Sequence, residues 1–206
     1  MNSLLTRITR ALTCGCFIIV LSIVLMGAAT HEAPHGHTAQ RSEVRMPIRN
    51  FSLTDQNGRS FDLQSVGGKV LLVDFAYTTC PDVCPLMTAA LRTVQTSLST
   101  TERKTVYLLT ITTDPEIDTP KVLAAYAKRY HADLSNWAFL TGDESSLARV
   151  WSNFGVKVTR RARGLVDHTA LTAVIDQSRS MRFAYHGAAP DAKVIVQDVR
   201  SLLARP

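Results

Sequence analysis

The sequence lacks a strong surplus of charge of either sign. Its formal net charge is +6, and this surplus falls to +4 when Arg7 and Arg10, which precede an apolar segment, are set aside. So small a surplus does not indicate binding to nucleic acid. The sequence also lacks an internal repeat, and its 46% hydrophobic and 19% charged residues are ordinary for a globular protein. These absences exclude a fibrous or disordered chain and favour a folded domain.

Charged residues are absent from residues 11–29, which are mostly Ile, Val, Leu and other apolar residues. As a helix this run is about 28 Å long, close to the hydrocarbon thickness of a membrane, which predicts a membrane anchor. The small residues 27–29 also suit a signal peptidase, so a cleaved signal peptide is the alternative. In both cases Arg7 and Arg10 stay on the cytoplasmic side. We therefore expect the rest of the chain on the extracytoplasmic, periplasmic side.

Three segments are predicted along the chain. Residues 1–29 form the anchor or signal segment, residues 30–45 a polar linker, and residues 46–206 one folded domain, which is too short for two cores. The linker contains His31, His35 and His37. These histidines either capture a metal ion loosely or belong to a solvated tether, and we favour the tether.

Strand-like and helix-like patterns alternate beyond the linker. Asn57-Gly58 between two alternating apolar stretches predicts an N-terminal β-hairpin. Apolar spacing and capping residues predict strands at 70–76, 106–111, 137–140, 171–176 and 182–185, and helices at 85–98, 120–130, 143–154 and 191–203. Asp114 and Asp118 lie at turns or caps and are expected to be structural. This order of elements predicts an α/β, thioredoxin-like fold.

Cys80 and Cys84 follow the predicted strand 70–76 directly and stand where the next helix begins. Because a helix N-terminus stabilises a thiolate, we expect both thiols to be more acidic than free cysteine. Three residues separate them, one more than in a thioredoxin-type motif, and this spacing brings both sulfurs to one side of a helical turn. The pair is therefore suited to a structural disulfide, to a redox couple or to one metal ion.

His168, which precedes the predicted strand 171–176, is a candidate third donor. Thiolates and imidazole both suit copper, and a set of two sulfurs and one nitrogen suits the low coordination number of Cu(I). Zinc would need a fourth ligand, and the neighbouring Asp167 points to the opposite face of an extended segment. A histidine in this position is otherwise a surface or hydrogen-bonded residue. The residues alone leave these alternatives open.

Three stretches of the chain, residues 77–85, 113–119 and 166–176, resemble the Sco (SenC) family of membrane-anchored copper-binding proteins that serve cytochrome c oxidase assembly. The resemblance spans about residues 46–204. It implies that Cys80, Cys84 and His168 bind one copper ion, as Cu(I) or Cu(II), within a thioredoxin-like fold. It also implies a mobile loop ahead of the histidine, at residues 160–164. Relative to thioredoxins the histidine replaces a cis-proline, which favours metal binding over disulfide catalysis.

The function that the resemblance implies is that of a copper metallochaperone delivering copper to the dinuclear copper site of cytochrome c oxidase. Its implied partners are the copper-site subunit of the oxidase, other periplasmic copper chaperones or thiol reductants, and the membrane. In the main alternative, Cys80 and Cys84 act as a thiol-disulfide oxidoreductase that keeps the subunit's cysteines reduced, which is the only enzyme activity expected. A copper-responsive sensor is a third hypothesis. Arg160, Arg161 and Arg163 are expected either to steer an acidic partner or to form a solvated loop.

Overall fold

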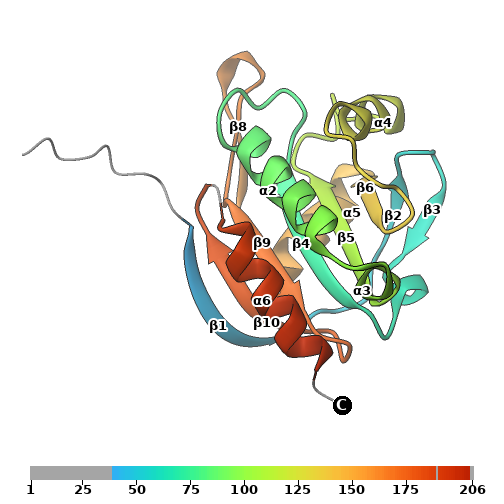
Figure 1. The fold of residues 1–206 in the computed structure, drawn as a ribbon. Coiled ribbons are helices and arrows are strands. Elements are labelled where there is room, and N and C mark those ends of the chain that lie inside the picture. The colour runs from blue at the N-terminus through green and yellow to red at the C-terminus, as the bar shows by residue number, and fades with distance from the viewer. Residues whose placement is uncertain (1–38, 189, 205–206) are drawn as a thin grey trace, which may run out of the picture. The chain divides into compact units, whose positions relative to one another are not determined.

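The computed structural model describes residues 39–188 and 190–204 (Figure 1). These residues form a mixed sheet of eight strands in the order β1-β10-β9-β4-β5-β6-β2-β3. Its strands are β1 (Gln40–Pro47), β2 (Ser52–Asp55), β3 (Ser60–Asp62), β4 (Val70–Ala76), β5 (Val106–Thr112), β6 (Trp137–Thr141), β9 (Leu171–Ile175) and β10 (Ser180–His186). The predicted anchor and the three linker histidines lie outside the described residues. None of the helices in the described ranges is long and apolar enough to cross a membrane.

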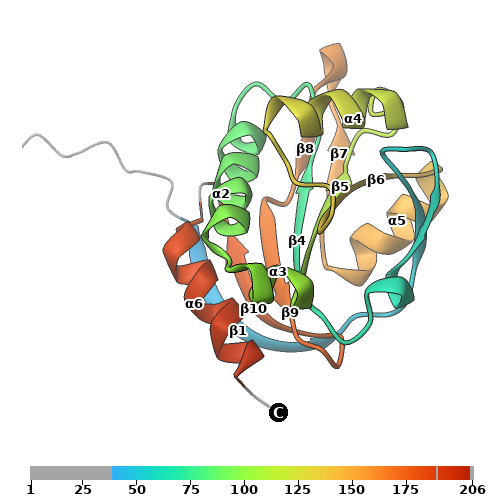
Figure 2. The same ribbon diagram turned by 45° about the vertical axis from the view of Figure 1, so that its right-hand side comes forward.

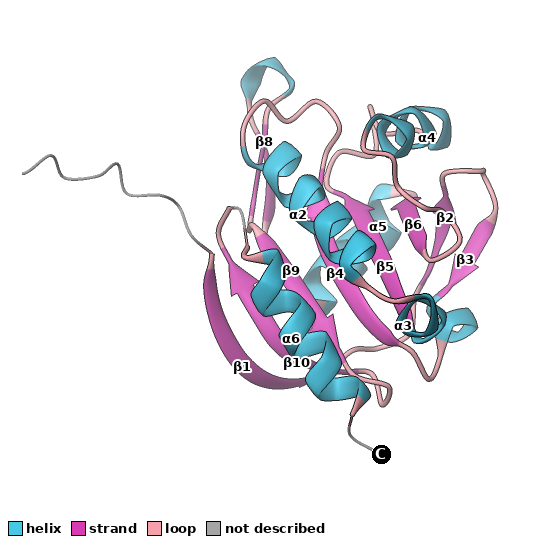
Figure 3. Ribbon diagram, viewed as in Figure 1, coloured by secondary structure: helices cyan, strands magenta, loops and turns pink. Residues whose placement is uncertain are grey.

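Helices cover both faces of this sheet. Figure 2 shows α2 and α6 on one side and α5 on the other, and Figure 3 shows the same layers coloured by secondary structure. The helices are α2 (Val83–Ser97), α3 (Thr100–Thr105), α4 (Pro120–Arg129), α5 (Glu144–Asn153) and α6 (Ala192–Leu203), with a 3-10 turn η2 (Leu63–Val66) after β3. The predicted α/β architecture is therefore confirmed for the described residues.

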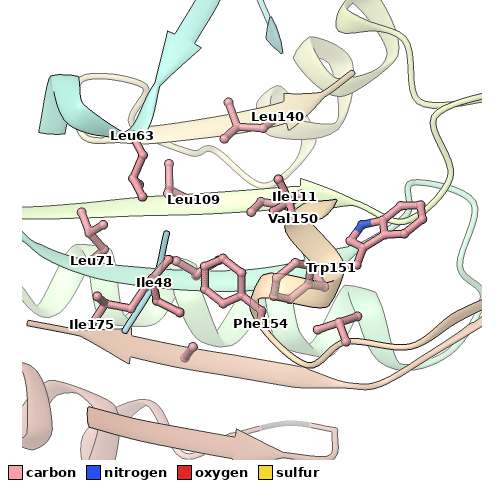
Figure 4. Close-up of a cluster of buried hydrophobic side chains, with 14 of the residues drawn as sticks. Ile48, Leu63, Leu71, Leu109, Ile111, Leu140, Val150, Trp151, Phe154 and Ile175 are labelled. Atoms are coloured by element: carbon pink, nitrogen blue, oxygen red, sulfur yellow. The ribbon is translucent and has the colours of Figure 1, made fainter. Parts of the chain in front are cut away.

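Each face of the sheet has its own hydrophobic core. On one face Leu91 of α2, Leu123 of α4 and Val199 of α6 belong to a single buried cluster. On the other face Trp151 of α5 and the following Phe154 pack over the central strands (Figure 4). All seven residues of β4 are buried, as expected for a central strand covered on both sides. The strand that leads to the thiols is thus held from both faces.

A second, two-stranded sheet lies outside the main one. It consists of β7 (Val158–Arg160) and β8 (Val166–His168), which pair antiparallel and are joined through the 3-10 turn η3 (Ala162–Gly164). We call residues 158–168 the histidine hairpin. In Figure 1 this hairpin stands beside the start of α2. The predicted loop at 160–164 is therefore the end of β7 and the turn that follows it, and its mobility stays a prediction.

The predicted boundary between linker and domain is wrong. Residues 40–45 were expected in the polar linker, but they belong to β1, which pairs antiparallel with β10. As an edge strand β1 alternates exposed and partly buried residues, so its sequence is polar enough to resemble a tether. Arg41 secures the strand through hydrogen bonds of 2.6 and 2.9 Å to the Asp198 carboxylate of α6.

Turn and cap signals were the most reliable local predictions. The hairpin of β2 and β3 is confirmed, and Gly58 in its turn has a φ of +75°, a conformation that glycine adopts without strain. Of the two predicted caps of α4, Thr119 is the N-cap. Helix α3 was not predicted, although Ser99 and Glu102 form a capping box that marks its start.

Candidate metal centre

The two cysteines lie at the junction between β4 and α2. Cys84 is the second residue of α2 and is fully buried, whereas Cys80 is half-buried in the loop before the helix. Both are free thiols. Cys84 shares a small cluster with Ala76, Tyr77 and Val166, and Cys80, Val83 and Val158 pack against that cluster. The histidine hairpin therefore contributes part of the wall around the thiols.

His168 of β8 meets this junction from a segment 84 residues away, with 3.6 Å between its Nε2 and the Sγ of Cys84. Its other ring nitrogen, Nδ1, lies 3.1 Å from the carbonyl oxygen of Thr169. Because a carbonyl oxygen only accepts hydrogen bonds, Nδ1 carries the proton and donates it. Nε2 then keeps its lone pair, directed at the sulfur. This tautomer is the one in which Nε2 can bind a metal ion.

Two further features affect the protonation and the surroundings of the His168 imidazole. Burial lowers the pKa of His168 and favours the neutral ring, the form that ligates metals. The ring of Tyr77 packs against the imidazole edge to face, with 5.9 Å between the ring centroids. Tyr77 opens the stretch 77–85 that carries the resemblance, but no role was expected for it, although its position between the buried strand and the first cysteine was a usable signal.

The two thiols differ in acidity, so the prediction that both are acidic is wrong for one of them. The neighbouring Cys84 thiol and the backbone N–H groups of Asp82 and Cys84 outweigh partial burial and lower the pKa of Cys80 to about 5. For Cys84 the hydrogen bond to Cys80 and burial both raise the pKa. The helix N-terminus acts on both residues, but in Cys84 the hydrogen bond to Cys80 and burial together outweigh its effect on the pKa.

The predicted ligands are brought together without forming a complete metal cage. Among residues 39–188 and 190–204, no three or more His, Cys, Asp or Glu side chains are arranged as they would be around an ion. The contact that exists joins Cys84 and His168, with Cys80 packed beside them. The donor set of two sulfurs and one imidazole nitrogen nevertheless fits a soft ion such as Cu(I).

The loop that carries Cys80 is held from the side by Asp118, which is fully buried. The carboxylate of Asp118 accepts hydrogen bonds from the backbone N–H of Thr78, at 3.2 and 3.3 Å, from the hydroxyl of Thr78, and from the hydroxyl of Thr112 at 2.6 Å. Burial raises the pKa of Asp118. The expected structural role of Asp118 is therefore confirmed, and Thr78 is a supporting residue that sequence reasoning had missed.

The basic residues of the histidine hairpin have partners within the chain. Arg160 lies 2.8 Å from an oxygen of Asp114 and 3.1 Å from an oxygen of Glu116, and Arg161 lies 2.6 Å from Asp167. The hairpin thus presents fewer unpaired cations than its sequence suggested. Arg160 and Arg161 are exposed, as expected for a solvated segment, but each has an acidic partner. The side chain of Arg163 lies outside the described part.

The chain matches the SCO1/SenC family model over residues 39–204. It is 37% identical over 140 residues to an SCO1 protein homolog of Bacillus subtilis, a match that covers 68% of this chain and 66% of that protein. The solved structure of BsSco, described as a Sco family member with a disulfide switch, superposes with a TM-score of 0.69 at 27% identity, covering 82% of this chain and 99% of that one. ScoI of Bradyrhizobium japonicum, solved with copper bound, has a TM-score of 0.64 at 28% identity and covers 76% and 99%. These likenesses confirm the predicted thioredoxin-like fold in its Sco form.

Proposed function

The chain belongs to the SCO1/SenC family, and from this premise we propose that it binds one copper ion through Cys80, Cys84 and His168. We propose further that it delivers this ion to the dinuclear copper site of cytochrome c oxidase during assembly. Two relatives support the proposal. The Bradyrhizobium ScoI structure contains copper, and BsSco is described as belonging to a family of cytochrome c oxidase assembly proteins.

The contact between Cys84 Sγ and His168 Nε2, at 3.6 Å, is the observation that carries this proposal. The Thr169 carbonyl leaves the lone pair of Nε2 free, and the low pKa of Cys80 supplies a thiolate near neutral pH. Metal ligands must be deprotonated, so copper would displace the proton of the Cys84 thiol when it binds. Cys80, which is hydrogen-bonded to Cys84, would supply the third donor to the same ion.

A competition titration tests the three ligands. The reduced full-length chain, in detergent, is titrated with Cu(I) against a chelator, beside Cys80→Ser, Cys84→Ser and His168→Ala variants. We expect one tightly bound ion in the parent chain and a loss of more than about tenfold in each variant, since even supporting residues typically contribute that much. His186, an exposed histidine of β10, provides the matched control His186→Ala. Unchanged affinity in His168→Ala would refute the three-ligand site.

The unequal thiols favour a second candidate function, thiol-disulfide exchange. The half-buried Cys80 thiolate would attack a partner disulfide and release one partner thiolate, and Cys84 would then attack Cys80 sulfur and release the second. The partner is reduced and the chain becomes a disulfide, which a thiol reductant must reverse. Exchange with a disulfide-linked peptide that proceeds equally fast in His168→Ala would support this function over copper delivery, because exchange needs no imidazole ligand.

We propose that the domain acts on the extracytoplasmic side and stays attached through residues 11–29. The uncharged length of that run and the preceding Arg7 and Arg10 support attachment. Mass spectrometry of the chain purified from its native membrane measures the N-terminus. An intact mass that includes residue 1 supports the anchor, whereas a mature chain starting at Ala29 or Thr30 contradicts it.

A further inference from the structure

The histidine hairpin is joined to the main sheet by few structural ties. Within the described residues its two strands pair only with each other; Val166 belongs to the cluster around Cys84, and Val158 packs against that cluster and against the larger cluster that includes Trp151 and Phe154. At its base Thr169 N–H donates to the Lys157 carbonyl at 3.0 Å, and Lys157 N–H donates to the Thr169 hydroxyl at 3.1 Å. These bonds lie within the segment itself, so they set its shape and leave its position over the thiols to other contacts.

Arg160 supplies a polar tie from the hairpin to the main body. Its guanidinium donates to Asp114 Oδ1 at 2.8 Å and lies 3.1 Å from Glu116 Oε2. Asp114 is fully buried, and its second oxygen, Oδ2, has no hydrogen-bond partner among the described residues. Arg160 is therefore the one side chain there that balances this carboxylate. A buried charge with a single partner strongly resists losing it.

The loop at residues 113–119 connects this ion pair to the cysteines. The backbone N–H groups of Ile117 and Asp118 donate to the Asp114 carbonyl at 3.2 and 2.9 Å, so these residues form one tight turn. From the same turn the Asp118 carboxylate binds Thr78, two residues before Cys80. One rigid loop thus contacts both the segment that carries Cys80 and the hairpin that carries His168.

We propose that Arg160 is a positioning residue for the metal centre, acting through its ion pair with Asp114 to hold His168 Nε2 beside Cys84 Sγ. In the hairpin ladder Arg160 pairs with Val166, and Val158 pairs with His168. Because the two strands are hydrogen-bonded in this register, a shift of Arg160 should also move His168. The inference deepens the proposed function and rests on it to the extent that His168 is a ligand. Arg160 and Asp114 act through His168 and are not themselves proposed as ligands of the ion.

A double-mutant cycle distinguishes positioning from general support of the fold. We expect Arg160→Gln to weaken Cu(I) binding by the full-length chain about tenfold, the lower end of what loss of a supporting partner costs a metal site. In the His168→Ala background the same change should have no further effect, because no imidazole remains to be positioned. An equal loss in both backgrounds would overturn the proposal.

Two neighbouring substitutions are matched controls. Arg161→Gln removes the same charge from the same hairpin, but Arg161 is paired with Asp167 inside the hairpin and both side chains are exposed. Glu116→Gln removes the exposed partner of Arg160 and leaves the buried one. Both should bind copper as the parent chain does. If Arg161→Gln weakens copper binding as much as Arg160→Gln, the loss of positive charge explains the weaker binding, and the positioning role of Arg160 is overturned.

A copper-free measurement separates this inference from the proposed function. The measurement is the NMR shift of the His168 ring protons in the reduced protein labelled at histidine, because the ring of Tyr77, 5.9 Å away between centroids, should contribute a ring-current shift. We expect this shift to change in Arg160→Gln and to be restored largely in Arg160→Lys, which keeps a charge for Asp114. An unchanged shift in Arg160→Gln overturns the positioning role, whatever the copper titration shows. Unchanged copper affinity in His168→Ala would instead refute the three-ligand function and leave this test intact.

Discussion

The two parts of the candidate metal centre are held in different ways. The thiol half, formed by β4 and α2, lies at the middle of the main sheet, where every residue of β4 is buried and α2 packs into the larger clusters. The histidine half is a two-stranded hairpin outside that sheet, supported by a few apolar contacts and by Arg160. One half is part of the core, and the other is fastened to it.

Because the two halves are held differently, each should control a different property of the protein. Substitutions in the thiol half should change the free energy of unfolding, because they remove contacts that the whole domain shares. Substitutions in the histidine half should change the position of one ligand while most of the fold stays intact. Apart from the proposed ligands themselves, copper binding and stability should therefore respond to different residues, and the following experiments test that separation in order of expected effect.

The largest effect is expected from Leu91→Ala in α2. Leu91 is fully buried in the cluster that α2 shares with α4 and α6. Removing its side chain leaves a cavity and should lower the free energy of unfolding by about 3 kcal/mol. Urea unfolding followed by circular dichroism measures the change. A loss below about 1 kcal/mol would show that this half is not the tightly packed one.

The next experiment compares the same substitution in both halves. Val94 of α2 is fully buried and Val166 of β8 is nearly so, yet only Val166 touches the cluster around Cys84. We expect Val94→Ala to cost about 2 kcal/mol of stability and Val166→Ala distinctly less. Val166→Ala should weaken copper binding more than Val94→Ala does. Equal stability losses, with equal copper affinities, would remove the distinction between the halves.

The acidity of the thiols gives a pH test within the thiol half. The pKa of Cys80 is about 5, so its thiolate persists from high pH down to about pH 5 and is protonated below it. The second-order rate constant for alkylation of Cys80 by iodoacetamide should therefore be nearly constant between pH 6 and 8 and fall about tenfold for each pH unit below 5. Peptide mapping assigns the modified residue.

The same alkylation experiment has an internal control in Cys84. Burial and the bond to Cys80 raise the pKa of Cys84, so in the folded chain it should stay unmodified across this pH range. In urea both cysteines should react with the pH dependence of free cysteine, near 8.5. A Cys80 rate that falls already between pH 9 and 7 would contradict the assigned asymmetry.

The smallest effect is expected from Gly58→Ala, in the turn of the β2–β3 hairpin, which is at the far edge of the main sheet. At a φ of +75° an alanine is strained even though nothing lies within 4 Å of its Cβ, so we expect a loss of about 1 kcal/mol. Copper affinity should not change. A change in copper affinity would mean that the edge hairpin is coupled to the centre, against the separation proposed here.

Much of the architecture could be predicted because its signals are local. The apolar run of β4, the Pro-containing start of α4 and the Asn57-Gly58 turn depend on residues close to one another in the chain. The candidate ligands Cys80, Cys84 and His168 could be named because they stand in short stretches that resemble the Sco family; their residue types suit copper but by themselves left other roles open. Strand β1 was not predicted, because an edge strand with one face in solvent has a polar composition like that of a linker.

Contacts between segments far apart in the chain could be known only from the folded structure. The sequence was enough to predict the main alternation of strands and helices, the thiol pair at a strand-to-helix junction and the candidate role of His168 as a nitrogen donor, but not β1, α3 or the histidine hairpin. It did not determine that Cys84 is buried while Cys80 remains partly open, nor that Arg160 is bound to Asp114, 46 residues away. Burial and ion pairing depend on which surfaces meet after folding. For that reason, acidity and ligand position follow from the packed chain and not from spacing along it.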